Sequence, residues 1–233
     1  DEQCASFPNL LATKKAPVLE AVGSSDKPDG LRVAVLFSGG PAAGGHNVIV
    51  GLKHYLGDSN TLLGIRRGPK GLLNGDFFEI TDEALQTVQN LGGFDFLMSD
   101  RTKIKTEDQF LQVEEVVKDH QISAIVIIGG DDSNTNAALL AERLHSLNCT
   151  VVGVPKTIDG DLQVDSKLPI SFGFDTATKI YSELVGNICQ DTASSVKYWH
   201  FVKLMGRSAS HVTLEVALQT KPAITLISEE ISE

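Results

Sequence analysis

The sequence predicts an α/β fold with three layers, in which a mainly parallel sheet lies between helices on both faces. Short apolar runs rich in β-branched residues alternate with segments whose apolar residues recur at helical spacing. The runs are apolar throughout, which is typical of strands buried on both faces of a parallel sheet. With 233 residues, 42% of them hydrophobic, the chain can bury a full core without a metal or disulfide staple.

The first half of the pattern begins after a weakly patterned stretch, residues 1–30, which we interpret as an arm or linker. A strand is expected at 31–37, an apolar run bounded by glycines. A helix at 46–56 and a second strand at 61–65 follow. The sequence Gly-Pro-Lys-Gly at 68–71 then predicts a loop.

The second half repeats the alternation. Thr106 and Gln109 form a capping-box pattern that predicts a helix ending near Asp119. A later helix is indicated by apolar residues at i, i+3, i+4 and i+7, namely Ala137, Leu140, Ala141 and Leu144. Strands are expected at 123–128, 150–154, 199–204 and 223–227, and further helices at 176–190 and 208–220.

Composition excludes some classes of function. The 20 basic and 30 acidic residues give a net charge of −10, which argues against a broad nucleic-acid-binding or anionic-membrane surface. No apolar run approaches the ~20 residues of a membrane-spanning helix. The three cysteines, Cys4, Cys149 and Cys189, form no metal motif, and we expect reduced thiols in a cytoplasmic protein.

Ligands of such sheets bind beyond the carboxyl ends of the strands, so the loops after the strands are the candidate sites. The first loop contains Gly39 and Gly40 and leads into a helix. Backbone N–H groups and a helix N-terminus there suit a phosphate. A purely structural glycine turn is an equally good reading of this loop alone.

The loop after the strand at 123–128 reads Gly-Gly-Asp-Asp-Ser. Asp131 and Asp132 offer hard oxygen ligands of the kind that Mg²⁺ takes together with phosphate oxygens. The structural alternative is that Asp131, Asp132 or Ser133 caps the next helix. Two adjacent carboxylates exceed what a cap requires, which favours the metal.

The loop after the strand at 150–154 reads Pro-Lys-Thr-Ile-Asp-Gly-Asp. Lys156, Asp159 and Asp161 supply a cation and two carboxylates, which are the parts that phosphoryl transfer needs. The alternative is an Asp-Gly turn with a solvated lysine. In the fourth loop, Arg207 is a candidate for gripping a sugar phosphate, and a capping Ser208 beside an exposed arginine is the alternative.

Five segments occur together in a recognisable order and spacing: 37–47, 129–136, 155–161, 171–177 and 205–211. In this set the chain resembles the phosphofructokinase family, and within it the long, pyrophosphate-using branch. The resemblance implies the phosphofructokinase-like fold over 31–233. It also implies transfer of a phosphoryl group to the 1-hydroxyl of fructose 6-phosphate, a step of glycolysis, with Mg²⁺ as cofactor.

The resemblance also implies roles for single residues. Gly39, through its backbone, and Gly40 would contact the phosphate donor, and Asp131 would hold Mg²⁺. Asp159 would take the hydroxyl proton while Thr157 helps to bind the sugar. Further substrate-binding roles are implied for Lys197, Tyr198, Met205, Gly206, Arg207 and Glu229. Lys197 and Tyr198 match a pair that reaches a neighbouring subunit, which implies a homodimer or a hetero-oligomer with a related chain.

The identity of the donor depends on Asp132 and Lys156, because ATP-using relatives have glycine at both positions. A carboxylate at 132 adds bulk and negative charge where a nucleotide would lie, and a cation at 156 can neutralise charge as phosphate leaves. Pyrophosphate is therefore expected, with ATP as the alternative. Asp100, where relatives have glycine, and Pro41-Ala42-Ala43 depart from the family pattern in the loops near the donor.

Other classes stay open. The branch contains non-catalytic regulatory chains, although the retained site residues favour a catalytic one. A nucleotide-binding module of the NAD kinase type also has Gly-Gly-Asp after a strand, but it does not explain the motif at 155–161. Because relatives continue with a further sugar-phosphate-binding segment, and the chain starts without Met, we expect this piece to lack the C-terminal portion of the fold. We therefore expect it to have weak or no activity alone.

Overall fold

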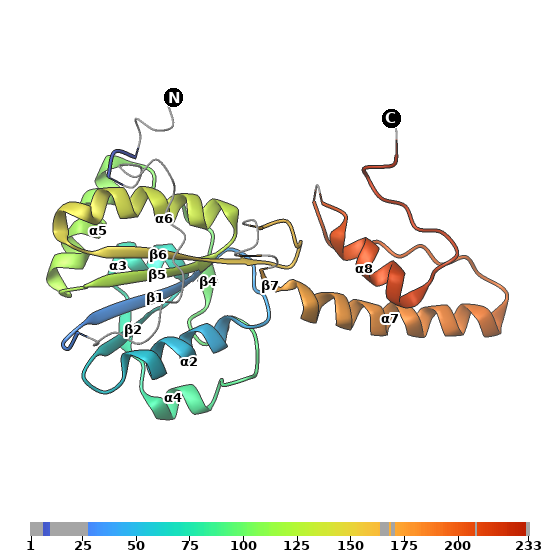
Figure 1. The fold of residues 1–233 in the computed structure, drawn as a ribbon, viewed down its shortest axis with the longest axis horizontal. Coiled ribbons are helices and arrows are strands. Elements are labelled where there is room, and N and C mark those ends of the chain that lie inside the picture. Colours follow the sequence, from blue (N-terminus) through green and yellow to red (C-terminus); the bar gives the residue numbers. More distant parts are fainter. Residues whose placement is uncertain (1–6, 10–27, 164–167, 169–170, 208, 232–233) are drawn as a thin grey trace. The chain divides into compact units, whose positions relative to one another are not determined.

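The computed structural model describes residues 7–9, 28–163, 168, 171–207 and 209–231 (Figure 1). Most of the expected arm at 1–30, and Ser208, lie outside the described residues. The chain divides into two compact units, Asp1–Pro155 and Lys156–Glu233. The sequence pattern did not predict this division.

The first unit is built on a sheet in the order β3-β2-β1-β5-β6. The strands are β1 (Arg32–Ser38), β2 (Thr61–Ile65), β3 (Phe77–Glu79), β4 (Ser99–Asp100), β5 (Ala124–Gly129) and β6 (Thr150–Thr157). All pairings are parallel except that of β2 with β3. β5 occupies one edge of β1, and β2 and the short β4 share the other edge.

Helices cover both faces of this sheet, as predicted. They are α2 (Gly45–Leu56), α3 (Gly68–Asn74), α4 (Asp82–Gln86), α5 (Glu107–Asp119) and α6 (Asp131–Leu144), with a 3₁₀ turn at His145–Leu147. Figure 1 shows α5 and α6 on one face and α2 and α4 on the other. Alternation along β1 sends Ala34 and Leu36 into the core beneath α3, α5 and α6, while the ring of Phe37 faces His46 of α2.

The expected loop at 68–71 is wrong, because these residues begin α3. Pro69 lies in the first turn, where a helix does not need its N–H, and Leu72 and Leu73 are buried against the core. The capping box of α5 is confirmed: the Thr106 hydroxyl accepts from the Gln109 N–H, and the Gln109 side chain accepts from the Thr106 N–H.

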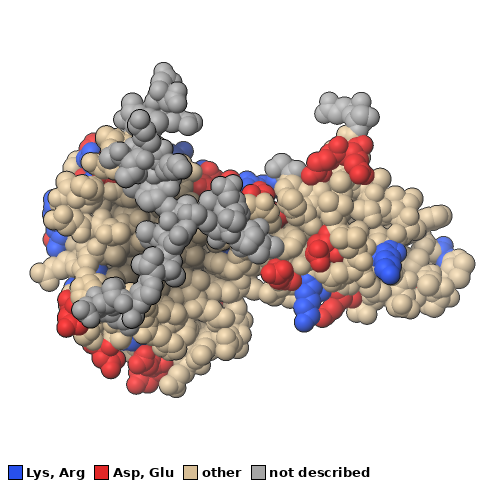
Figure 2. Space-filling model, in the orientation of Figure 1, with Lys and Arg blue, Asp and Glu red and all other residues tan. Residues whose placement is uncertain are grey.

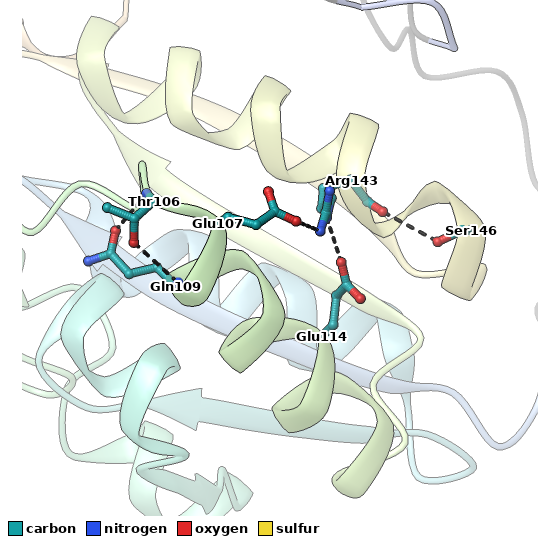
Figure 3. A network of polar contacts seen from close by, with 6 residues as sticks. All are labelled: Thr106, Glu107, Gln109, Glu114, Arg143 and Ser146. Atoms are coloured by element: carbon teal, nitrogen blue, oxygen red, sulfur yellow. Dashed lines mark hydrogen bonds and ion pairs between the residues drawn. The ribbon is translucent and has the colours of Figure 1, made fainter.

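Helices α5 and α6 are joined at the surface through Arg143, which lies between two carboxylates of α5 (Figure 3). Its Nε donates to Glu114 at 2.6 Å, and its terminal nitrogen pairs with Glu107. A two-carboxylate contact fixes a planar guanidinium better than one carboxylate does. The contact therefore holds α6 in register with α5 at the end of α6 remote from its first turn.

The second unit contains β7 (Phe172–Gly173), α7 (Phe174–Ser195) and α8 (His211–Thr220). Lys156 and Thr157, the end of β6, pair with β7, and α7 packs on α8 around Phe174, Val185, Val212 and Val216. The strands expected at 199–204 and 223–227 are wrong: these residues are irregular. Their apolar side chains are largely exposed, as at Phe201 (94%) and Ile224 (71%), so no burial stabilises an extended pairing.

On the face in view in Figure 2, lysine and arginine side chains are dispersed among acidic ones. No helix of the described residues is both long enough and apolar enough to cross a bilayer.

Candidate functional site

Three loops of the first unit meet at one edge of its sheet. Ser38, the last residue of β1, is in register with Gly129 at the end of β5 and with Asp100 at the end of β4. The residues that follow these three strands therefore emerge side by side. The sequence predicted this meeting for the loops after β1 and β5, and the loop after β4 is the third member.

Gly39 follows β1 with φ of 86°, a left-handed conformation that favours glycine. Its N–H donates to the Asp100 carbonyl at 3.0 Å, and its carbonyl accepts from the Ser99 hydroxyl at 2.6 Å. Both backbone groups of Gly39 are thus engaged with β4. What this glycine offers a ligand is the space left by its missing side chain.

The first turn of α6 packs closely on the ends of β1 and β5, and this packing fixes the loop after β5. The Ser133 hydroxyl donates to that of Ser38 at 2.8 Å. A methyl group at Gly129 would lie 2.5 Å from Ser133 Cβ and 2.8 Å from the Ser38 carbonyl oxygen. Only glycine allows the first turn of α6 to approach β1 this closely.

The capping alternative for the Asp-Asp pair is wrong in this structure. The N-cap of α6 is Gly130, and no side chain caps this helix, so Asp131 and Asp132 lie in its first turn. Carboxylates are favourable there because the helix dipole is positive at that end. The described residues contain no cluster of three or more His, Cys, Asp or Glu side chains able to hold a metal. The donor set fits Mg²⁺ held by one or two carboxylates together with ligand phosphate oxygens.

The loop after β4, residues 101–105, brings two cations that motif reading did not single out. Arg101 lies against Gly40, where an added methyl group would be 3.5 Å from its guanidinium. The Lys103 ammonium is 2.8 Å from a carboxylate oxygen of Asp132. A two-residue strand leaves almost no periodic signal. The family resemblance set the loop of Asp100 near the donor, and the register of β4 places these two cations there.

Asp100, the departure from the family pattern, turns its carboxylate onto its own loop. The Thr102 N–H donates to it at 2.7 Å. Burial alone would raise the pKa of Asp100, but hydrogen bonds from Thr102 and from the backbone N–H groups of Arg101 and Lys70 outweigh burial and lower it. The side chain therefore stabilises the loop as a carboxylate.

The same loop is fastened to α6 by a buried amide. Asn136 accepts from the Ile104 N–H at 3.1 Å and donates to the Ile104 carbonyl at 2.7 Å. Ile104 is fully buried, and Asn136 is 9% exposed. One side chain thus satisfies both backbone groups of a residue in the middle of the loop.

The second unit holds the other set of predicted residues, beginning with Lys156 and Thr157, which are both buried. The Thr157 hydroxyl accepts from the Asp159 N–H at 3.0 Å, which closes a tight turn. Gly160 has φ of 74°, and an added methyl group would lie 2.9 Å from the Phe174 ring. The Asp-Gly turn of the structural alternative is therefore present, but the lysine that this alternative expected to be solvated is buried.

Arg207 and Asp159 are brought together by the fold. Nε of Arg207 is 3.6 Å from a carboxylate oxygen of Asp159, and the Asp159 side chain is 15% exposed whereas that of Arg207 is 65% exposed. Met205 and Gly206 precede this arginine and are exposed. The arrangement gives a largely enclosed carboxylate beside an exposed cation.

Glu229 stands at the start of α8. One of its oxygens accepts from the Ser210 N–H at 3.0 Å, and the other accepts from the hydroxyls of Ser210 and of Ser228. The Ser210 hydroxyl is the main cause that lowers the pKa of Glu229 to about 2. In this structure the Glu229 carboxylate binds the N-cap residue of α8. The side chain of Ser210 itself makes no capping hydrogen bond.

Lys197 and Tyr198 follow α7 and are exposed, and the lysine ammonium lies 5.1 Å from the centroid of the tyrosine ring. Among the described contacts, none joins this pair to Asp159, Arg207 or Glu229. A role that reaches another subunit therefore stays a prediction.

Comparison with known proteins identifies relatives of the chain. The chain is 54% identical over 215 residues to pyrophosphate–fructose 6-phosphate 1-phosphotransferase of Treponema pallidum, covering 90% of this chain and 37% of that protein. It is 50% identical over 236 residues to subunit beta 2 of the enzyme of the same name from Arabidopsis thaliana, covering 97% of this chain and 41% of that subunit. The chain thus spans about two fifths of the length of these curated relatives.

Among solved structures, the pyrophosphate-dependent phosphofructokinase of Marinobacter aquaeolei matches with a TM-score of 0.68 and 23% identity, covering 81% of this chain and 49% of that one. This likeness supports the α/β fold. The family model for phosphofructokinase matches residues 32–233. Because this match covers far more than half of the sequence, the chain belongs to the phosphofructokinase family.

Proposed function

We propose that the protein transfers a phosphoryl group from pyrophosphate to the 1-hydroxyl of fructose 6-phosphate, giving fructose 1,6-bisphosphate and orthophosphate. The observation that carries the proposal is the meeting of the loops after β1, β4 and β5, which sets two glycines, two cations and two carboxylates at one sheet edge. Relatives at 54% and 50% identity are named for this reaction.

On the donor side, Gly39 and Gly40 give the phosphates room to approach the backbone, and Arg101 is a cation beside them. Asp131 would hold Mg²⁺, which when bound neutralises phosphate charge and withdraws electrons from the phosphorus. Asp132 occupies space and adds negative charge at the same helix start, which disfavours a nucleotide more than the compact pyrophosphate.

On the acceptor side, Asp159 is the base. It takes the proton of the 1-hydroxyl as the new O–P bond forms and the bridging P–O bond of pyrophosphate breaks. Lys156 balances the charge of the departing phosphate, and Arg207 binds the sugar phosphate. The Thr157 hydroxyl holds the turn that aims Asp159, as its 3.0 Å contact with the Asp159 N–H supports.

Further parts of the proposal concern the remaining residues. Met205, Gly206 and Glu229 would contact the sugar, and Lys197 and Tyr198 would reach the site of a neighbouring subunit in a homodimer or a hetero-oligomer. The reaction would serve glycolysis in the cytoplasm. ATP as donor is the second candidate, because Asp132 and Lys156 are the only two residues that argue against it.

The test is to assay the protein in its full length with Mg²⁺ and fructose 6-phosphate, using pyrophosphate and ATP in parallel. Turnover with pyrophosphate and little with ATP is expected, and Asp132→Gly with Lys156→Gly should shift the preference towards ATP. Asp159→Asn should lower kcat by ~10²-fold or more. Asp191→Asn, an exposed carboxylate of α7, is the matched control and should change kcat by less than about two-fold.

No turnover with either donor would overturn the catalytic reading and favour a regulatory chain of the same fold. Turnover with ATP alone would overturn the choice of donor.

A further inference from the structure

The loop after β4, residues 101–105, touches one face of α6 at two points. Ile104 is bonded through both backbone groups to Asn136, and the Lys103 ammonium reaches Asp132 at 2.8 Å. Asp132 and Asn136 are four residues apart in the helix, so they lie one above the other on the same face. The loop therefore runs along the first turns of α6.

The anchor at Asn136 limits what Lys103 can do. Its neighbour Ile104 is fully buried, and both of its backbone polar groups bond to Asn136. The backbone of Lys103 therefore has little conformational freedom. An exposed ion pair is ordinarily weak because both long side chains must be ordered to form it. Here the anchor at Ile104 already orders the backbone of Lys103. The entropy cost of forming the ion pair is therefore limited to ordering the lysine side chain.

We propose that Lys103 is a positioning residue that fixes the Asp132 carboxylate and offsets its charge, so that pyrophosphate can bind beside it. This inference rests on the proposed function, in which Asp132 borders the donor. Pyrophosphate is an anion, and a carboxylate at its edge repels it more strongly the less its charge is offset by a nearby cation. Lys103 thus makes a residue that excludes nucleotides compatible with the smaller donor.

Two other roles for Lys103 agree with the same contacts. The lysine could contact the donor phosphates directly, or it could be a solvated surface residue with no effect on the donor. Its contact with Asp132 favours an action through the carboxylate, and a double-mutant cycle separates the three.

The experiment measures the Kd of magnesium pyrophosphate by calorimetry, and KM and kcat in parallel, for the full-length protein and its variants. Lys103→Met should raise Kd and KM three- to five-fold, the ceiling for an exposed pair, with kcat changed by less than about two-fold. Lys103→Arg should restore most of the affinity. Lys105→Met removes the same charge from an exposed position of the same loop and should leave Kd within about 1.5-fold.

The decisive arm places Lys103→Met in an Asp132→Gly background, where the loss of affinity should shrink to less than about 1.5-fold. A loss that persists there would mean direct contact with the donor and would overturn the inference. An unchanged Kd in the single variant would overturn it as well. Failure of the proposed function would show instead in the unaltered protein, as pyrophosphate binding without transfer to fructose 6-phosphate.

Discussion

The amide of Asn136 provides the most direct test of how the loop after β4 is held. Replacing Asn136 with alanine removes both hydrogen bonds to Ile104, at 3.1 and 2.7 Å, and leaves an N–H and a carbonyl at a fully buried residue without these partners. A buried unpaired polar group costs about 1–3 kcal/mol. We expect Asn136→Ala to lower the free energy of unfolding by about 2–4 kcal/mol, because some water can enter the space of the lost side chain.

The assay is urea denaturation followed by far-UV circular dichroism, together with hydrogen exchange of peptides that cover the loop. Thr135→Ala is the matched control: its exposed hydroxyl bonds only to the Asp131 carbonyl of its own helix, and a change below about 0.5 kcal/mol is expected. Asn136→Asp should fall between the two, because a carboxylate can accept from the Ile104 N–H but cannot donate to its carbonyl. A loss below about 0.5 kcal/mol in Asn136→Ala, with unchanged exchange in the loop, would refute the reasoning.

Three further outcomes are expected. Burial lowers the pKa of His46 below its ordinary 6.5, so the unfolded chain binds more protons than the folded one as pH falls below that value. The free energy of unfolding should then fall by up to about 1.4 kcal/mol for each unit by which pH is lowered between 6.5 and the folded-state pKa. Urea denaturation of His46→Gln at several pH values should lack this dependence. Burial raises the pKa of the Cys149 thiol to about 11, so mass spectrometry should find it alkylated at pH 8 only after unfolding. In Gly129→Ala the added methyl group would lie 2.5 Å from Ser133 Cβ, so thermal denaturation should show a free energy of unfolding lower by about 1–3 kcal/mol. Gly51→Ala, with open space around it, is the control and should not lower it.

Where the sequence carried a periodic signal, prediction of the fold succeeded. The strands at the centre of the sheet and the capping box of Thr106 and Gln109 were placed almost to the residue, because burial on both faces and paired caps leave strong local patterns. The strands expected at 199–204 and 223–227 failed for the converse reason. An apolar run there predicts burial, but the described residues give Phe201 and Ile224 nothing to be buried against.

The candidate site was predictable where function depends on single loops after strands. Asp131 and Asp132 follow β5 as expected. β6 runs to Thr157, beyond its expected end at Val154, so Lys156 and Thr157 lie in the strand and Asp159 follows it. Lys103 and Arg101 were not singled out because their position follows from the pairing of β4 with β1, and a pairing over two residues has no periodicity to detect. The engagement of Gly39 by Asp100 likewise depends on which strand is its neighbour, which only the assembled sheet decides.

The brevity of β4 has a consequence for motion. Two residues of pairing make it the most weakly bonded strand of the first unit, while β5, which leads into α6, pairs along its whole length with β1. Local opening is easiest where backbone bonding is sparse. A fluctuation that separates β4 from β1 would move Arg101 away from Gly40. Lys103 would stay beside Asp132, because Asn136 holds its neighbour Ile104. The positive charge at this sheet edge is thus coupled to the opening of one short strand through Arg101 alone, while the Lys103–Asp132 pair depends on α6.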